Sequence, residues 1–380
     1  TNTLGVAARV FTILVNDGTL PNERSGQGNI FSGLSTGRQA QNQLAFAALQ
    51  PGGTIVTWGD KDSGGAGASG VPTENGYVNI TQNSKAFAAL RQDGSIRSWG
   101  DPTYGGTGAP TGSGYVRVYA TTSAFAAMKP DGSITTWGNA ANGGTINPLA
   151  TGTGYTQIFT GSNAMAAMKA DGSIITWGRP ATGGTGAPAT TGYTTITNNA
   201  YAFAALKNDG SITAWGDLIY GGANAPTNNG YIAVYSNPNG FAALNGNGTI
   251  STWGYTQSGE KEFPGGNNFV SISGNSGAYA ALNTSGSIVA WGSPTKGGSN
   301  FPTGTGYTAI YSTPNAFAAL KADGSITAWG SDTEGGAGAP TGTGFTKIYS
   351  NSGAFVAMKA DGSLKSWGGA DNGGVGKAPT

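Results

Sequence analysis

Every tryptophan in this chain is followed by glycine, and the Trp-Gly pairs recur at a nearly constant interval. The nine tryptophans are Trp58, Trp99, Trp137, Trp177, Trp215, Trp253, Trp291, Trp329 and Trp367. Their successive spacings are 41, 38 and 40 residues, and then 38 residues five times. Such a period is typical of propellers, solenoids and other repeat arrays. Positions that recur in every unit are expected to serve the fold, and positions that vary are where a function can lie.

A single unit, residues 193–226, predicts three short strands and no helix. Residues 193–197 are rich in β-branched side chains, and residues 202–207 and 211–216 form two further apolar runs. Residues 208–210 read Asn-Asp-Gly, which is a hairpin signal because glycine supplies the positive φ that the turn needs. No segment has the length and period of a helix, so the chain is predicted to be all β.

Two small residues recur in all nine units. One is the alanine two positions after the aromatic of the middle strand: Ala48, Ala89, Ala127, Ala167, Ala205, Ala243, Ala281, Ala319 and Ala357. The other is the hairpin glycine: Gly53, Gly94, Gly132, Gly172, Gly210, Gly248, Gly286, Gly324 and Gly362. Small residues let neighbouring sheets approach, while Phe and Trp fill the wider space between them. We predict a β-propeller with blades of about 38 residues; a β-solenoid or an open spiral is the alternative.

The first 44 residues depart from the pattern. Residues 10–20, Val-Phe-Thr-Ile-Leu-Val-Asn-Asp-Gly-Thr-Leu, match the middle strand and hairpin of a unit, but no tryptophan follows. We predict that residues 1–44 are a degenerate N-terminal repeat and that residues 45–380 are the propeller repeats, since terminal repeats are often atypical. In the alternative, the strand in residues 4–15 closes the ring or pairs with another subunit.

Composition excludes several classes of function. The formal net charge is +1 and only 10% of residues are charged, so there is no basic field for nucleic acid. No apolar run is long enough to predict membrane insertion. Cysteine and histidine are absent, which removes thiolate chemistry and the commonest metal ligand and proton shuttle; no cofactor, metal site or catalytic residue is predicted. The chain begins at Thr1 rather than Met, which fits a processed, exported protein.

The repeated residues resemble a known family. Residues 316–330, Ala-Phe-Ala-Ala-Leu-Lys-Ala-Asp-Gly-Ser-Ile-Thr-Ala-Trp-Gly, with Gly335-Gly336 and Ala339-Pro340 after them, resemble repeats of the regulator of chromosome condensation superfamily. The short-repeat branch typified by the propeller-type β-lactamase inhibitory protein is the most similar. The resemblance implies a β-propeller. Two departures are the absence of the histidine common before the second strand, and Gly-Gly in place of Gly-Gln after Trp-Gly; nine units also exceed the usual seven blades.

The loops that follow Trp-Gly vary most and lie on one end of the predicted blades. In three antiparallel strands, they emerge on the same end as the loops between the first and second strands, opposite the hairpins between the second and third strands. Aromatic and arginine side chains on variable loops commonly anchor protein interfaces, and in the inhibitor branch such loops bind the partner. The candidate protein-binding residues are Tyr104, Tyr201, Tyr220, Tyr255, Arg179, Asp101, Asp217 and Glu334. In the alternative, the tyrosines only shield the glycine-rich loops.

The opposite end carries aspartates in hairpins. Six of them follow a basic residue two positions earlier: Asp93, Asp131, Asp171, Asp209, Asp323 and Asp361, after Arg91, Lys129, Lys169, Lys207, Lys321 and Lys359. This end is expected to be a ring of balanced, solvated charge in which each exposed pair contributes about 0–1 kcal/mol. Aspartate before glycine is turn chemistry first.

These features predict a non-enzymatic β-propeller, extracellular or at a bacterial-type cell surface, that acts as a binding or assembly module. The partner is another protein or a second copy of the chain. One alternative is a secreted protein inhibitor of an enzyme. A further alternative is a carboxylate-dependent hydrolase or lyase, since only carboxylates, Lys or Tyr could act as acid or base here, although no spacing singles out a pair of carboxylates.

Overall fold

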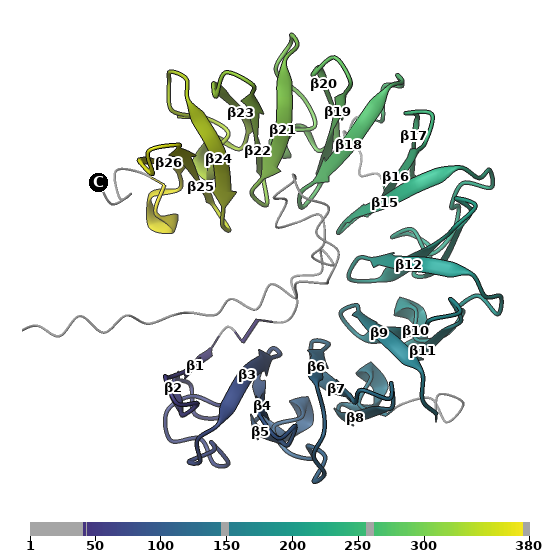
Figure 1. The fold of residues 1–380 in the computed structure, drawn as a ribbon, viewed down its shortest axis with the longest axis vertical. Coiled ribbons are helices and arrows are strands. Elements are labelled where there is room, and N and C mark those ends of the chain that lie inside the picture. The colour runs from purple at the N-terminus through teal and green to yellow at the C-terminus, as the bar shows by residue number, and fades with distance from the viewer. Residues whose placement is uncertain (1–40, 43, 146–151, 256–261, 375–380) are drawn as a thin grey trace, which may run out of the picture.

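The computed structural model describes residues 41–42, 44–145, 152–255 and 262–374. These residues form nine antiparallel sheets, of which eight have three strands and the first has two. Figure 1 shows the sheets following one another around a common axis, with the first strand of each three-stranded sheet nearest the centre. The protein is therefore an all-β propeller, and the solenoid alternative, with units stacked in a straight rod, is not its architecture.

The strands repeat in the same order in each blade. First strands, nearest the axis, are β3 (Tyr77–Gln82), β6 (Arg117–Ala120), β9 (Tyr155–Thr160), β12 (Tyr193–Asn198), β15 (Tyr231–Asn237), β18 (Phe269–Gly274), β21 (Tyr307–Ser312) and β24 (Phe345–Ser350). Middle strands are β1 (Ala45–Leu49), β4 (Ala86–Arg91), β7 (Ala124–Met128), β10 (Ala164–Lys169), β13 (Ala202–Lys207), β16 (Gly240–Asn245), β19 (Ala278–Asn283), β22 (Ala316–Lys321) and β25 (Ala354–Lys359). Outer strands are β2 (Ile55–Gly59), β5 (Ile96–Gly100), β8 (Ile134–Gly138), β11 (Ile174–Gly178), β14 (Ile212–Gly216), β17 (Ile250–Gly254), β20 (Ile288–Gly292), β23 (Ile326–Gly330) and β26 (Leu364–Gly368).

The three strands predicted in residues 193–226 are confirmed, and each predicted strand end lies within one residue of the observed end. β13 pairs with β12 on one side and with β14 on the other, so that Phe203 lies opposite Asn198 and opposite Trp215. The sequence did not predict the single 3₁₀ turns that follow the outer strands. They are η1 (Pro102–Tyr104), η2 (Ala140–Asn142), η4 (Pro180–Thr182), η5 (Pro294–Lys296), η6 (Asp332–Glu334) and η7 (Ala370–Asn372).

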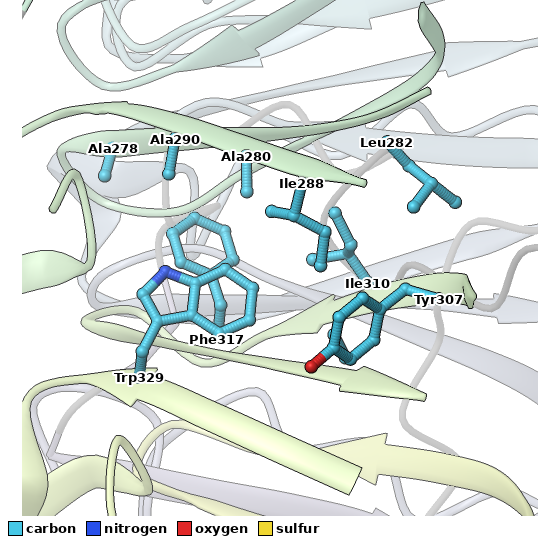
Figure 2. Close-up of a cluster of buried hydrophobic side chains, with 10 residues drawn as sticks. Ala278, Ala280, Leu282, Ile288, Ala290, Tyr307, Ile310, Phe317 and Trp329 are labelled. Atoms are coloured by element: carbon cyan, nitrogen blue, oxygen red, sulfur yellow. The ribbon is translucent and has the colours of Figure 1, made fainter. Parts of the chain in front are cut away.

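Each interface between blades joins an alanine-rich face to an aromatic face. Figure 2 shows Ala278, Ala280 and Ala290 of one blade over the rings of Phe317 and Trp329 of the next. The two rings stack with centroids 5.3 Å apart, and neither is more than 4% exposed. Offset stacking of this kind is worth about 0.5–1.5 kcal/mol beyond the area buried. Methyl groups on one side and large rings on the other let the sheets pack closely.

The indole N–H groups also connect the blades. Seven indoles donate to the first glycine of the Gly-Gly pair in the preceding loop, over 2.9–3.2 Å: Trp99 to Gly64, Trp137 to Gly105, Trp177 to Gly143, Trp215 to Gly183, Trp253 to Gly221, Trp329 to Gly297 and Trp367 to Gly335. A buried indole N–H without an acceptor would cost about 1–3 kcal/mol. The Trp-Gly and Gly-Gly motifs thus form two halves of one contact.

The Gly-Gly pair has a steric cause. A Cβ on Gly183 would lie 2.6 Å from the ring of Phe203, and Gly183 has a φ of +95°. A Cβ on Gly184 would overlap the carbonyl oxygen of Gly178. Neither position can therefore carry a side chain without moving backbone or a buried ring.

Side chains near the axis add hydrogen bonds between successive first strands. Thr81 donates to the carbonyl of Val118 over 3.3 Å, and Thr197 donates to that of Val234 over 3.1 Å. On the same strand, the side-chain amide of Asn198 donates to the carbonyl of Thr160 over 2.9 Å. The blades are therefore joined at the axis by polar contacts and further out by apolar ones.

The first blade departs from the prediction that every tryptophan is wedged between sheets. Trp58 is 47% exposed, whereas the other eight indoles are at most 9% exposed. Its ring still stacks on Phe46, with centroids 5.3 Å apart. The cause is that no described sheet precedes β1–β2. The predicted N-terminal repeat in residues 1–44 lies almost wholly outside the described residues, so that prediction is not tested.

Gly184→Ala is expected to destabilise the protein by about 1–3 kcal/mol, because its Cβ would force the loop away from Gly178. Gly112→Ala is the matched control. Gly112 has no atom within 4 Å of an added Cβ, so this change should stay within about 0.5 kcal/mol of wild type. Urea denaturation followed by tryptophan fluorescence measures both. Equal midpoints for the two variants would contradict the steric explanation.

Candidate functional site

The end of the propeller opposite the hairpins is built on a repeated hydrogen-bonded asparagine. The side-chain oxygen of Asn199 accepts the backbone N–H groups of Tyr201 and Ala202, and its amide donates to the carbonyl of Tyr220 over 2.8 Å. Asn199 is fully buried. It therefore joins the loop before β13 to the loop after β14. Equivalent bonds to the residue 21 positions on are made by Asn42, Asn83, Thr121, Asn275, Thr313 and Asn351.

The residue whose carbonyl accepts this asparagine or threonine bond, such as Tyr220, directly precedes the Gly-Gly pair. Its side chain faces a side chain from the loop before the middle strand. These partners lie 19 residues apart and differ from blade to blade. The ammonium group of Lys85 lies 5.2 Å from the ring centroid of Tyr104, and the amide of Asn315 donates to both carboxylate oxygens of Glu334 over 2.8 Å. The backbone is thus constant, while a matched pair of side chains varies on top of it.

Three predicted tyrosines come together at this end. The ring centroids of Tyr201 and Tyr220 lie 4.5 Å apart, and those of Tyr220 and Tyr255 lie 5.8 Å apart. The first two belong to the blade β12–β14 and the third follows β17 of the next blade. In the same loop as Tyr220, Leu218 is 71% exposed and Ile219 is 59% exposed. We call these five residues the tyrosine surface.

Of the other predicted residues, Asp217 lies in the loop of Tyr220, whereas Tyr104, Asp101, Arg179 and Glu334 belong to loops of other blades. Tyr104 lies beneath Lys85, three blades away from the first two tyrosines along the chain. Arg179 is exposed, precedes η4 and makes no side-chain cap. Tyr201, Tyr220 and Tyr255 were predicted as binding residues, but Leu218 and Ile219 were not. Two adjacent aliphatic residues in a variable loop would have been the signal for them.

Asp101 and Asp217 have a local structural role. Asp101 caps η1, because its carboxylate accepts the backbone N–H of Thr103 over 2.8 Å. Asp217 accepts the N–H of Ile219 over 2.9 Å and shapes the loop that carries Tyr220. The two carboxylates therefore position the loops, and their oxygens are partly occupied by these bonds.

The hairpin end has a different structure from the expected ring of paired charges. Lysines in five blades lie over aromatic rings at 4.8–5.0 Å from the centroid: Lys129 over Tyr115, Lys169 over Tyr155, Lys207 over Tyr193, Lys321 over Tyr307 and Lys359 over Phe345. A cation–π contact between a lysine ammonium and an aromatic ring at an exposed site contributes about 0.5–1 kcal/mol of stability. In the part of the chain that the structure describes, the one ion pair joins Arg97 and Glu74 at 3.8 Å. The expectation of base–aspartate pairs is wrong, because each lysine contacts a ring.

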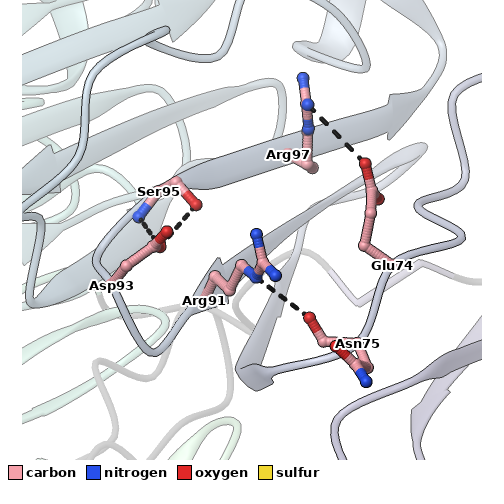
Figure 3. A network of polar contacts seen from close by, with 6 residues as sticks. All are labelled: Glu74, Asn75, Arg91, Asp93, Ser95 and Arg97. Atoms are coloured by element: carbon pink, nitrogen blue, oxygen red, sulfur yellow. Dashed lines mark hydrogen bonds and ion pairs between the residues drawn. The ribbon is translucent and has the colours of Figure 1, made fainter.

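The hairpin aspartates instead bond to the turn. The backbone N–H of Ser211 and its hydroxyl both donate to one oxygen of Asp209, over 2.9 and 2.7 Å, and Figure 3 shows the same arrangement for Asp93 and Ser95. These bonds lower the pKa of Asp209 below its usual range, the backbone bond most. A lowered pKa means that the carboxylate's contribution to folding is present near neutral pH and is lost as the pH falls through the folded-state pKa.

A shallow hollow lies beside the hairpin of Asp93. It has a volume of about 470 Å³ and is lined by Asn75, Gly76, Arg91, Gln92 and Asp93. The guanidinium of Arg91 donates to the carbonyl of Asn75 over 3.0 Å, at the edge of the hollow.

Across the described ranges, no three acidic side chains gather in a way that could hold a metal ion. No helix within those ranges has the length and hydropathy to cross a bilayer.

Among known proteins, the chain is similar in fold to several solved structures, at low sequence identity. No family model and no curated protein sequence matches the chain. The CRINKLY WD40 ectodomain of the Arabidopsis thaliana receptor kinase ACR4 is 17% identical, with a TM-score of 0.38, over 64% of this chain and 90% of that chain. Prp20p from Saccharomyces cerevisiae, the yeast RCC1 protein, is 15% identical, with a TM-score of 0.36, over 60% and 74%. BamB from Moraxella catarrhalis is 13% identical, with a TM-score of 0.33, over 77% and 94%. The propeller assignment rests on the nine sheets themselves.

Asn199→Ala is expected to lower the free energy of unfolding by about 1–3 kcal/mol, because it leaves the buried N–H of Ala202 and the carbonyl of Tyr220 without their partner. Asn199→Thr should recover part of this loss. Thr121 and Thr313 already occupy the equivalent position and make both types of bond. Thermal melting compares the variants; a threonine variant no better than alanine would contradict this role.

Proposed function

We propose that the protein is a non-enzymatic, exported β-propeller that binds another protein through the tyrosine surface. The observation that carries the proposal is the contact of Tyr201, Tyr220 and Tyr255 across two blades, beside the exposed Leu218 and Ile219. Aromatic residues are enriched where binding energy concentrates, and a contiguous apolar patch on a soluble protein commonly marks an interaction site.

The chemistry of the surface favours a partner segment with apolar side chains and hydrogen-bond acceptors. The tyrosine rings offer apolar faces and hydroxyl groups, and Leu218 and Ile219 offer aliphatic contacts. The Asp217 carboxylate of the same loop is already engaged with the backbone. Burial of Leu218 and Ile219 would release more energy than a salt bridge at the rim, since apolar burial contributes about 25 cal/mol per Å² and exposed ion pairs contribute little.

The scaffold supports a binding role by limiting the cost of ordering the loops. Asn199 and Asp217 fix the backbone beneath Tyr220 through four hydrogen bonds to Tyr201, Ala202, Tyr220 and Ile219. A preorganised loop loses less conformational entropy when a partner binds. The proposed location is extracellular or at a bacterial cell surface, on the basis of the composition and the cysteine-free sequence.

Within this proposal, assembly and inhibition differ in stoichiometry. An assembly module binds further copies or a structural protein, whereas an inhibitor similar to the β-lactamase-inhibitory branch caps one enzyme molecule. Light scattering across a concentration series separates them: growing oligomers that Tyr220→Ala dissociates indicate assembly, and a monomer that forms a 1:1 complex with its partner indicates inhibition.

Tyr220→Ala is expected to weaken partner binding at least about tenfold, because Tyr220 contacts both other tyrosines and truncating a hot-spot residue costs about 2 kcal/mol or more. The full chain, immobilised, is exposed to proteins from the medium and surface of the cells that make it. Retained partners are identified by mass spectrometry and titrated to obtain Kd.

Asp209→Asn is the matched control, since Asp209 lies in the hairpin at the other end of the same blade. A partner counts only if Asp209→Asn retains it, Tyr220→Ala loses it, and both variants keep the wild-type melting temperature. Loss of binding together with stability would reduce Tyr220 to a packing residue. Unchanged Kd in a stable Tyr220→Ala variant would refute the proposed surface.

A further inference from the structure

One of the side-chain pairs on the loop end differs in chemistry from the others. In the blade β12–β14, the residues 19 positions apart are both tyrosines, Tyr201 and Tyr220, and their rings are in contact. In two other blades the equivalent pair is lysine on tyrosine or asparagine on glutamate. Two phenol rings in contact can be joined to each other by oxidation, and the other two pairs cannot.

The tyrosines of this chain are otherwise kept apart from one another. All 15 lie within the described residues. Two tyrosine–tyrosine ring contacts occur among them, and both involve Tyr220, with centroids 4.5 Å from Tyr201 and 5.8 Å from Tyr255. Seven other tyrosines are at most 7% exposed: Tyr77, Tyr115, Tyr155, Tyr193, Tyr231, Tyr279 and Tyr307. Coupling between phenol rings is therefore favoured at one place in the molecule.

Few other side chains compete for an oxidant in solution. The chain contains no cysteine, and eight of its nine indoles are at most 9% exposed, Trp58 being the exception. Tyr201 is 37% exposed and Tyr255 is 39% exposed, while Tyr220 lies between them and is partly buried. The tyrosine surface thus offers accessible phenols to an oxidant. Three of the four methionines are at most 6% exposed: Met128, Met165 and Met168.

A single buried side chain holds the backbone beneath both rings. The oxygen of Asn199 accepts the N–H of Tyr201 over 2.9 Å, and its amide donates to the carbonyl of Tyr220 over 2.8 Å. Two groups fixed in contact react as if at a very high concentration. Directly bonded phenyl rings have centroids at nearly the separation of this pair, so joining them requires rotation of the side chains and little movement of the backbone.

We propose that Tyr201 and Tyr220 form an oxidative modification site, at which hydrogen peroxide used by a haem peroxidase joins the two rings as dityrosine. Each phenol loses one electron and its hydroxyl proton. The two phenoxyl radicals form a bond between one Cε of each ring, and the hydrogen on each of these carbons moves to the oxygen of the same ring. One hydrogen peroxide accepts the two electrons and two protons and becomes two water molecules. The protein therefore loses two hydrogens in total.

The new bond ties the loop before β13 to the loop after β14. It closes a loop in the chain and so restricts the unfolded state, as a disulfide does, in a protein whose sequence has no cysteine. The oxidised protein is therefore expected to melt at a higher temperature than the untreated protein. The reaction uses the free protein alone, so it can succeed or fail independently of the proposed protein partner.

Oxidation of the full chain with hydrogen peroxide and a haem peroxidase is the direct test. It should give the blue fluorescence of dityrosine and a monomer lighter by two hydrogens, with a yield that does not depend on protein concentration. Peptide mass spectrometry should find Tyr201 joined to Tyr220. Cross-linked dimers whose yield rises with concentration, or a bond between other tyrosines in place of this one, would overturn the proposal.

Exchanging the pairs of two blades tests whether their geometry directs the reaction. Tyr201→Lys should abolish the cross-link, because it gives this blade the lysine-on-tyrosine pair of Lys85 and Tyr104. Lys85→Tyr in the otherwise unchanged chain should create a second cross-link, to Tyr104. Asn83 holds that backbone as Asn199 does, by donating to the carbonyl of Tyr104 over 2.6 Å and accepting the N–H of Lys85 over 3.1 Å. A wild-type yield from Tyr201→Lys, or no second cross-link from Lys85→Tyr, contradicts the proposal.

Phenylalanine variants separate the chemistry from the packing of the rings. Tyr220→Phe keeps a ring in the cluster but has no hydroxyl to oxidise, so it should lose the cross-link and should not gain melting temperature on oxidation. Tyr255→Phe should still form the bond between Tyr201 and Tyr220 and should gain melting temperature as the wild type does. Loss of the cross-link in Tyr255→Phe but not in Tyr220→Phe would assign the reaction to other tyrosines and refute the site.

Discussion

The contact between a tryptophan and the glycine-rich loop of the preceding blade is the constraint on which the rest of the structure depends. The indole N–H of Trp215 needs an acceptor, which is the carbonyl of Gly183, and a Cβ on Gly183 would meet the rings of Phe203 and Trp215. Gly184 is required for a second reason, because a Cβ there would overlap the backbone of Gly178. The loop must therefore turn sharply, and it does so through a 3₁₀ turn that ends at Gly183. Loop geometry and interface packing are consequently one requirement, repeated at the seven interfaces where an indole donates to this loop.

This requirement leaves the side chains at the loop tips free to vary. The carbonyl before Gly-Gly is held from below by asparagine or threonine, as in the bond from Asn199 to Tyr220, so the backbone does not depend on which side chain it carries. One blade presents tyrosine on tyrosine, another lysine on tyrosine, and a third asparagine on glutamate. Variation can thus accumulate in matched pairs on this end without altering the fold.

The sequence predicted the fold well because the fold is periodic. Strand order, the hairpins and the wedged indoles follow from residues repeated nine times, as in residues 193–226. The exception, Trp58, could not be predicted, since its exposure depends on what lies next to it and not on its own residue type. The clustering of Tyr201, Tyr220 and Tyr255 could likewise not be predicted, because it joins loops of two blades.

The spacings of 19 and 21 residues within a unit would have signalled the paired loop positions. The lysines over aromatic rings were not predicted, because the expected partner of each lysine was the aspartate two residues on.

Charge in this chain serves local structure, and this bears on how the loop end can recognise a partner. Asp209 holds a hairpin, Asp217 shapes the loop of Tyr220, and Lys207 lies on the ring of Tyr193. With a net charge of +1 and only 10% charged residues, several of them engaged within single blades, the molecule has little long-range field with which to steer an encounter. Specificity must then come from the shape and apolar character of the tyrosine surface, where Leu218, Ile219 and three rings provide area that only a complementary surface can bury.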